Sequence, residues 1–362
     1  MIDNRMGDSG MEDNRIQDNR MEDKEDYLST LNERQLDAVT TTEGYVRIIA
    51  GAGTGKTKAL THRYAYLVNE LGISTSNILC VTFTNKAARE MSKRIRQMIG
   101  DSDTGYICTF HGFCVKLLRE DIHAINFPQN FVVMDDEDTE EILKTVYENA
   151  HIQSRTYTFD SARDHITALK SQMLHIPYLA EIGNEKLLAD YEKAEKVEDK
   201  VFLGYLYEQK KVYGLDYDDL ITIALYILQT DETKRIKWQE RMMYVMVDEF
   251  QDVSNSQYAL AEILSGYHRN LFIVGDPDQT IYTWRGAQIE YILEFDETHE
   301  NTRTIFLDMN YRSTPEILAV SNSLIEKNKK RLPHRLEAYK ESGRRPIYIC
   351  LLYTSPSPRD LS

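Results

Sequence analysis

Short apolar runs alternate with longer amphipathic segments along most of the chain. Five runs of four to six residues are almost wholly apolar, at residues 45–50, 78–83, 242–247, 271–274 and 304–307. Helical spacing of apolar positions follows the first two runs, in "THRYAYLVNEL" and "NKAAREMSKRIRQMI". Strands of a parallel sheet read as continuous apolar runs, because helices cover both of its faces. The pattern therefore predicts an α/β fold with a parallel sheet.

The alternation breaks in two places, which suggests how the chain is divided. Residues 120–214 are rich in Glu, Lys and Tyr and lack strand signals, so we expect a helical insertion there. A new strand–helix pattern starts at residue 301 but stops short of the length that a second α/β domain needs. The expected units are a disordered acidic tail (1–26), the first α/β domain in two parts (27–119 and 215–300), the insertion (120–214), the start of a second α/β domain (301–350) and an irregular Ser/Pro-rich tail (351–362).

Composition and charge limit the expected location of the protein, its binding to nucleic acid and the state of its cysteines. No apolar run approaches the ~18 residues of a membrane span and the acidic N-terminus has no signal-peptide pattern, so we expect a cytoplasmic protein without membrane contact. The net charge of −15 argues against indiscriminate nucleic-acid binding, yet residues 86–96 carry five bases. We interpret this local basic face as a solvated helix surface with some electrostatic effect. The four cysteines form no CxxC pair and are expected to be thiols without metal or disulfide: Cys80, Cys108, Cys114 and Cys350.

The segment "AGAGTGKT" at residues 50–57 is typical of a phosphate-binding loop. Its glycines let backbone N–H groups turn inward around an anion, and the following helix adds its positive N-terminal end. Lys56 would reach the β- and γ-phosphates, and the Thr57 hydroxyl would hold Mg²⁺. The general pattern has Gly where this chain has Ala50, a small departure at a buried strand end.

The segment "VMVDEFQD" at residues 245–252 ends an apolar run in carboxylates. Asp248 is placed for a second Mg²⁺ contact, and Glu249 can orient and deprotonate an attacking water. Because ligands gather at the carboxyl ends of parallel strands, both motifs are expected at one edge of the sheet.

Seven motifs occur in an order that resembles the superfamily 1 DNA helicases of the UvrD/PcrA/Rep type. They are "LNERQLDAV", "AGAGTGKT", "TFTNKAAREM", "TFHGF", "VDEFQD", "VGDPDQTIYTWRGA" and "LDMNYRS". The resemblance covers about residues 27–349. It implies a RecA-like P-loop NTPase sheet with an inserted helical subdomain and an incomplete second RecA-like domain. Members of that family use ATP and Mg²⁺ to move 3′ to 5′ along single-stranded DNA.

On the ATP side, the resemblance assigns roles to individual residues. Gln35 resembles the glutamine that reads the adenine edge, although with Asn32 it also has the spacing of a helix capping box. Tyr311 is similar to the residue that stacks on adenine, and Arg312 to an arginine finger. Gln279 is similar to the residue that senses the γ-phosphate. The implied catalytic residues are Lys56, Glu249, Gln279 and Arg312; the implied ATP-binding residues are Gln35, Ala52, Gly53, Thr54, Gly55, Lys56, Thr57, Lys58 and Tyr311; the implied Mg²⁺ ligands are Thr57 and Asp248.

On the DNA side, the resemblance implies a track of stacking and backbone contacts. One of only two tryptophans, Trp284, lies in a polar loop five residues after Gln279, so a short span of backbone would join an ATP sensor to base-stacking rings. "LDYDDL" at residues 215–220 is interpreted as a structural cap. The implied DNA-binding residues are Thr82, Phe83, Asn85, Thr109, His111, Tyr282, Trp284 and Arg285.

The leading interpretation is an ATP-driven DNA helicase or translocase, with single-stranded DNA and its junctions with duplex as partners and repair or replication proteins as further ones. Motifs that the family carries after "NYRS" are missing from this sequence, so we expect weak Mg·ATP binding, little DNA-stimulated turnover and no unwinding. Two alternatives stay open: an ATP-dependent single-stranded DNA binding module, and the N-terminal part of a helicase–nuclease subunit.

Overall fold

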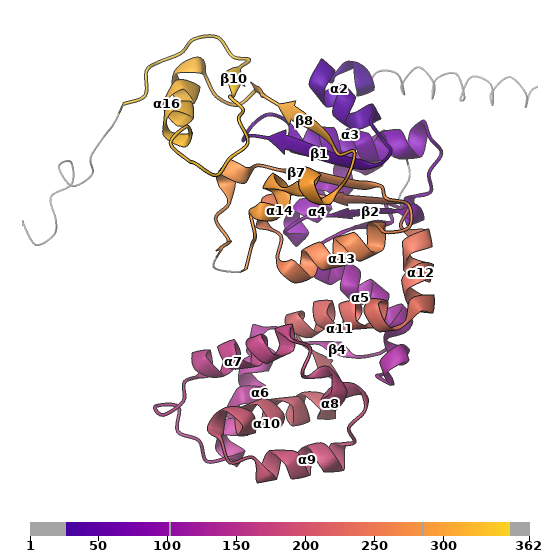
Figure 1. The fold of residues 1–362 in the computed structure, drawn as a ribbon, viewed down its shortest axis with the longest axis vertical. Coiled ribbons are helices and arrows are strands. Elements are labelled where there is room, and N and C mark those ends of the chain that lie inside the picture. The colour runs from indigo at the N-terminus through magenta and orange to yellow at the C-terminus, as the bar shows by residue number, and fades with distance from the viewer. Residues whose placement is uncertain (1–26, 101–102, 284–285, 348–362) are drawn as a thin grey trace, which may run out of the picture.

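The computed structural model describes residues 27–100, 103–283 and 286–347, and it contains a six-stranded parallel sheet (Figure 1). The strand order is β3-β2-β6-β7-β1-β8, and every neighbouring pair is parallel. The strands are β1 (Tyr45–Ala50), β2 (Ile78–Val81), β3 (Tyr106–Cys108), β6 (Tyr244–Val247), β7 (Leu271–Gly275) and β8 (Arg303–Leu307). The expected α/β fold with a parallel sheet is confirmed, and β3 is the one strand of this sheet that no apolar run had indicated.

Helices cover both faces of the sheet, as the continuous apolar runs require. In β2, Ile78 and Cys80 pack into one core and Leu79 and Val81 into the other, because successive side chains point to opposite faces. The first core is closed by α2 (Glu33–Thr40), α3 (Lys56–Asn69) and α4 (Asn85–Ile99). The second is closed by α5 (Phe110–Asp121), α11 (Tyr217–Thr230), α12 (Glu232–Arg241), α13 (Asn255–Ser265), α14 (Glu290–Leu293) and α15 (Phe295–Thr298).

The helical insertion forms a separate lobe below the sheet in Figure 1. The chain leaves and re-enters through a two-residue parallel ribbon, β4 (Val132–Val133) with β5 (Gly214–Leu215). The lobe has its own core between Met134 and Leu206, whereas Phe127 and Phe131, near the expected start of the insertion, pack into the core of the sheet domain. Its helices are α6 (Asp136–Asn149), α7 (Phe159–Ser171), α8 (Ile176–Ala180), α9 (Asn184–Lys193) and α10 (Val197–Lys211).

The apolar run near residue 304 does not open a second sheet. As β8, it pairs with β1 at the edge of the first sheet, with Ile48 opposite Ile305. The first domain therefore extends past the boundary expected at residue 301. Beyond it lie α16 (Pro315–Ile325) and a small ribbon of β9 (Met309–Asn310) and β10 (Glu337–Ala338).

The remaining expectations concern the cysteines, the two tails and membrane contact. Cys80 and Cys114 are buried, as expected, and Cys108 is half-buried; all three are free thiols. Cys350, the tail at 1–26 and the tail at 351–362 lie outside the described residues. Among the described helices, none combines the length and apolarity needed to cross a bilayer.

Candidate nucleotide and nucleic-acid sites

A cavity of about 590 Å³ opens at the carboxyl end of β1, where the phosphate loop begins. Its wall includes most of the residues expected to bind ATP. The lining residues are Thr30, Gln35, Gly51, Ala52, Gly53, Gly55, Lys56, Thr57, Lys58, Arg94, Glu249, Gln279, Tyr311 and Arg312. Arg94, from the basic face of α4, is a lining residue that the motifs had not indicated.

The phosphate loop has the conformation that its glycines permit. Gly53 and Gly55 have φ of 76° and 94°, in the left-handed region that side chains rarely adopt. A Cβ at Gly53 would lie 2.7 Å from the Cβ of Arg312, so this glycine also allows close approach of the loop that follows β8. Within the described part of the chain no side chain caps α3, which leaves its first N–H groups able to bind an anion.

The loop after β8 is fastened directly to the phosphate loop. The buried Asn310 donates from Nδ2 to the carbonyl of Ala52 at 2.5 Å, and the backbone N–H of Tyr311 donates to the carbonyl of Gly53 at 2.9 Å. These contacts bring Tyr311 and Arg312 into the cavity wall. Asn310 itself was not among the expected site residues, although it stands in the "NYRS" motif.

Tyr311 is held from two sides. Asn32 Nδ2 donates to its hydroxyl at 2.6 Å, and the ring of Tyr339 lies 4.9 Å from the Tyr311 ring. Protein contacts thus hold the ring that is expected to meet adenine.

Gln35 caps its helix as well as lining the cavity. The capping box with Asn32 is present, and Gln35 Nε2 donates to the carbonyl of Thr54 at 3.0 Å. Its amide is therefore engaged on both sides, and adenine contact remains a prediction. Thr54 is buried and is not among the lining residues, while Lys58 lines the cavity with its Nζ 2.5 Å from the carbonyl of Thr30.

Acidic residues at the end of β6 lie against the phosphate-loop lysine. Glu249, with a φ of 50°, turns its carboxylate to within 3.0 Å of Lys56 Nζ. Burial, followed by the negative charge of Glu249, raises the pKa of Asp248 to about 6. A buried carboxylate next to a second one is stabilised as an anion by a cation, and the oxygens of Asp248 and Thr57 are the hard ligands that Mg²⁺ prefers. This donor set fits Mg²⁺.

Gln279 reaches the cavity from the short helix Pro277–Gln279 after β7. Its Nε2 donates to Asp276, so the amide turns back toward its own loop. Arg331 pairs with the neighbouring Asp278 at 2.9 Å and links this loop to the segment after α16.

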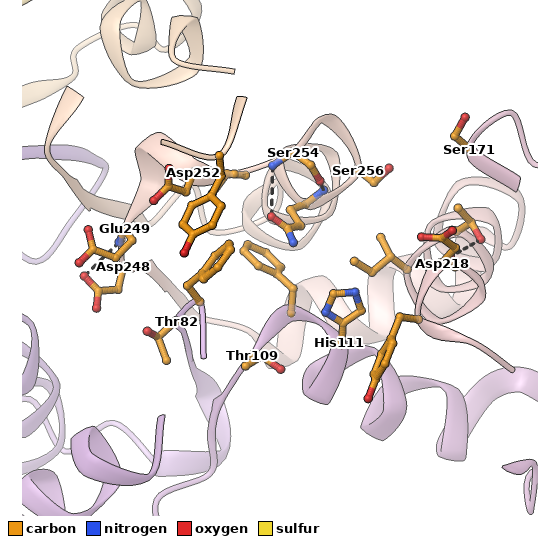
Figure 2. Close-up of a pocket in the computed structure, with 18 of the residues that line it drawn as sticks. Thr82, Thr109, His111, Ser171, Asp218, Asp248, Glu249, Asp252, Ser254 and Ser256 are labelled. Carbon is orange, nitrogen blue, oxygen red and sulfur yellow. Dashed lines mark hydrogen bonds between the residues drawn. The ribbon is translucent and has the colours of Figure 1, made fainter. Parts of the chain in front are cut away.

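A second cavity, of about 430 Å³, extends from the carboxylates at the end of β6 toward the insertion (Figure 2). Asp248 and Glu249 lie at one end, and Asp218 and Ser171 at the other. In its wall the rings of Phe83 and Tyr282 stack with centroids 4.8 Å apart. The described lining residues include these rings and four carboxylates but no Lys or Arg, so the cavity offers stacking faces to bases and no positive charge to phosphates.

Most residues expected to bind DNA meet in this second cavity. Those lining it are Thr82, Phe83, Thr109, His111 and Tyr282. Thr109 also caps α5, and burial lowers the pKa of His111, so its ring is neutral near pH 7. Asn85 is exposed at the start of α4 and does not line the cavity, while Trp284 and Arg285 lie outside the described residues.

The same cavity contains residues that the motifs did not indicate as site residues. "LDYDDL" does form a structural cap, because Asp216 and Asp219 make the capping box of α11. Between them, Tyr217 and Asp218 line the cavity, and the Tyr217 ring lies 5.4 Å from that of His111. Thr167 and Ser171 join them from α7 of the insertion. The sequence signal available for Tyr217 was its position beside Asp218, inside the capping motif. For Thr167 and Ser171 of α7, the sequence gave no such signal.

The parallel sheet, the glycine loop after β1 and the carboxylates after β6 define a P-loop protein of the α/β class. The family model of the UvrD/REP helicase N-terminal domain matches residues 31–300. The ATP-dependent DNA helicase PcrA of Staphylococcus aureus (strain Mu50) is 38% identical over 334 residues, which cover 92% of this chain and 44% of that protein. PcrA of Staphylococcus epidermidis (strain ATCC 12228) is 37% identical over 334 residues, which again cover 92% of this chain and 44% of that protein. The chain belongs to the UvrD/REP helicase family, and it spans less than half the length of these relatives.

Proposed function

We propose that this chain forms the ATP-binding motor part of a DNA helicase that moves 3′ to 5′ along single-stranded DNA. The nucleotide occupies the cavity at the phosphate loop, with Mg²⁺ held by Thr57 and Asp248. Lys56 and Arg312 place positive charge on the phosphates, and Glu249 takes the proton of the attacking water. The magnesium ion, when bound, neutralises phosphate charge. Unpaired bases stack in the second cavity, which we call the aromatic cavity after the stacked rings of Phe83 and Tyr282 in its wall.

One observation carries this proposal: Glu249 lines both cavities. It touches Lys56 on the nucleotide side and lies with Asp248 at one end of the aromatic cavity on the other. A change in phosphate occupancy at Lys56 can therefore reach the cavity that holds the stacking rings through the ion pair of Lys56 with Glu249. This is the relationship that a nucleic-acid-driven ATPase needs.

Each remaining role extends this arrangement. Gln279 reports the γ-phosphate to the loop that continues through Tyr282, Trp284 and Arg285, and the family's DNA substrates make single strands and duplex junctions the expected partners. A cytoplasmic location and a role beside repair or replication proteins fit such a motor.

The direct test is steady-state phosphate release by the 362-residue chain, with and without an oligo-dT strand. We expect weak Mg²⁺-dependent hydrolysis that rises only slightly with oligo-dT and is lost in Lys56→Ala, with Lys86→Ala as the exposed-lysine control. Equal rates for wild type and Lys56→Ala would reject the nucleotide assignment. Hydrolysis that ignores oligo-dT, together with no oligo-dT binding, would reject the nucleic-acid assignment.

A further inference from the structure

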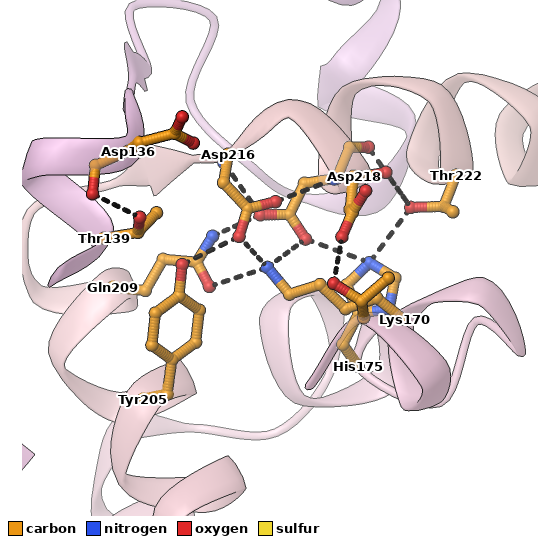
Figure 3. Close-up of polar contacts among 11 residues, drawn as sticks. Asp136, Thr139, Lys170, His175, Tyr205, Gln209, Asp216, Asp218 and Thr222 are labelled. Atoms are coloured by element: carbon orange, nitrogen blue, oxygen red, sulfur yellow. Dashed lines mark hydrogen bonds and ion pairs between the residues drawn. The ribbon is translucent and has the colours of Figure 1, made fainter. Parts of the chain in front are cut away.

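A buried ionic cluster joins the insertion to the sheet domain beside the aromatic cavity (Figure 3). At its centre is Lys170 of α7, which has no exposed surface. Its Nζ lies 2.5 Å from Asp216 Oδ2 and 2.8 Å from Asp219 Oδ1. These two carboxylates also form the capping box of α11, so one lysine binds the start of a helix in the other lobe.

Three more side chains complete the cluster. The Tyr205 hydroxyl donates to Asp216 at 2.7 Å, and Gln209 Nε2 donates to Asp219, both from α10. His175, at the start of α8, places Nε2 3.2 Å from Asp219 Oδ1. Side chains from α7, α8 and α10 therefore meet at two carboxylates of α11.

The pKa shifts in the cluster indicate which of its side chains are charged. Burial acts to lower the pKa of Lys170, but the charges of Asp216 and Asp219 outweigh it and raise that pKa. Burial, helped by the charge of Lys170, lowers the pKa of His175 to about 3, so the imidazole is neutral. Lys170 is thus a cation facing Asp216, whereas burial, together with the charge of Asp216, raises the pKa of Asp219 to about 7.

Such a cluster is a costly way to gain stability. Removing charges from water costs several kcal/mol per ion, and apolar replacements of buried ion pairs are often equally stable. Apolar packing between the lobes already exists, because Ile176 and Leu179 of α8 enter the core of the sheet domain. The ionic cluster adds a defined orientation of the helices, because hydrogen bonds fix the position and rotation of a helix more narrowly than apolar contacts do.

The helix whose orientation matters here is α7, because one of its faces lines the aromatic cavity. Thr167, one turn before Lys170, donates to Asp218 Oδ2 at 2.8 Å, and Ser171 follows Lys170 directly. Thr167, Ser171 and Asp218 all line the cavity. On α11, Thr222 lines it too, and its hydroxyl lies 3.3 Å from His175 Nε2.

We propose that Lys170 is a positioning residue for nucleic-acid binding: by binding the capping carboxylates of α11, it holds α7 so that the insertion forms one wall of the aromatic cavity. This inference rests on the proposed function, because it assigns the cavity to bases. It assigns the insertion a part in the binding site that the helicase motifs do not indicate.

The test compares Lys170→Met with wild type in two binding assays on the full chain. Anisotropy of a fluorescein-labelled dT oligonucleotide reports the aromatic cavity, and fluorescence of mant-ATP reports the nucleotide cavity. Because a small displacement of a binding wall is costly, we expect oligonucleotide affinity to fall about tenfold, with mant-ATP affinity within about twofold of wild type. Lys186→Met, an exposed lysine of α9, is the matched control and should change neither.

Hydrogen–deuterium exchange gives a readout that does not need DNA. In Lys170→Met, exchange should accelerate in α7 and the first turn of α11, while β1, β6 and β7 keep wild-type protection. Unchanged exchange in α7, or equal losses of oligonucleotide and mant-ATP affinity, would overturn the proposal. If Lys170→Met does not fold, Lys170→Met/Asp219→Asn removes one unpaired charge and is held to the same expectations. If wild type fails to bind the oligonucleotide, the proposed function fails, and exchange in α7 still decides whether Lys170 holds the insertion.

Discussion

The ammonium group of Lys56 lies 3.0 Å from the carboxylate of Glu249, which ties the phosphate loop to the end of β6. Under the proposed function, this ion pair joins the cation that would hold phosphate to the base that would activate water. A phosphate bound there would compete for Lys56 and release the carboxylate for proton transfer. The proposal therefore links ligand binding to activation of the base.

Replacing Glu249 by Gln should separate binding from hydrolysis. The amide cannot accept a proton, and loss of a general base costs about 10²- to 10⁴-fold in rate. Lys56 also loses its ionic partner, so mant-ATP affinity should stay equal to wild type or rise. The measurement is phosphate release beside mant-ATP titration, with the exposed Glu297→Gln as control. Wild-type turnover by Glu249→Gln would show that another group activates the water.

Substitutions at Tyr311 should separate the ring from its hydroxyl. Tyr311→Ala removes the proposed stacking face, and aromatic contacts of this kind contribute about 0.5–1.5 kcal/mol beyond area burial, so mant-ATP affinity should fall about two- to tenfold. Tyr311→Phe keeps the ring and loses only the hydrogen bond from Asn32. The mant-ATP affinity of Tyr311→Phe should lie between those of wild type and Tyr311→Ala, and closer to that of wild type. Equal losses in both variants would assign the effect to the hydroxyl and not to stacking.

The stacked pair of Phe83 and Tyr282 leads to a prediction for nucleic-acid binding. Stacking of a base on an aromatic ring is worth about 1–3 kcal/mol, so Phe83→Ala should weaken binding of labelled oligo-dT by about 5- to 150-fold. Tyr267→Ala, an exposed ring outside the cavity, is the control. Because stacking does not read sequence, the loss should be similar for oligo-dT and oligo-dA. A wild-type affinity in Phe83→Ala would exclude the cavity as the base-binding site.

The sequence predicted those parts of the fold and the site that depend on local patterns. Strands buried on both faces leave continuous apolar runs, and the glycine loop needs its left-handed residues at fixed positions, so both could be located in one dimension. Motif residues such as Lys56, Glu249 and Gln279 were then brought together because parallel strands end at one edge.

The parts that escaped prediction depend on packing between distant segments. β8 has the apolar pattern of any buried strand, and nothing local decides whether it pairs with β1 or opens another sheet. Lys170 looks like a surface lysine in an amphipathic helix until Asp216 and Asp219 are placed against it. Gln35 shows the opposite case, since its capping spacing was visible in the sequence and is present in the structure.

The ion pair of the buried His299 with the partly exposed Glu262 predicts a pH-dependent contribution to stability. Burial acts to lower the pKa of His299, but the hydrogen bond and charge of Glu262, 2.8 Å away, outweigh it and raise that pKa above its ordinary value. A raised folded-state pKa stabilises the fold fully below the unfolded value of about 6.5, and this stabilisation is lost as the pH rises through the folded value. Glu262→Gln keeps the shape of the side chain and removes its charge. In urea titrations, the deficit of Glu262→Gln in free energy of unfolding should therefore be largest near pH 6 and shrink toward about pH 9. Glu297→Gln, an exposed carboxylate, should show no such trend, and a Glu262→Gln deficit that stays constant or grows with pH would contradict the assignment.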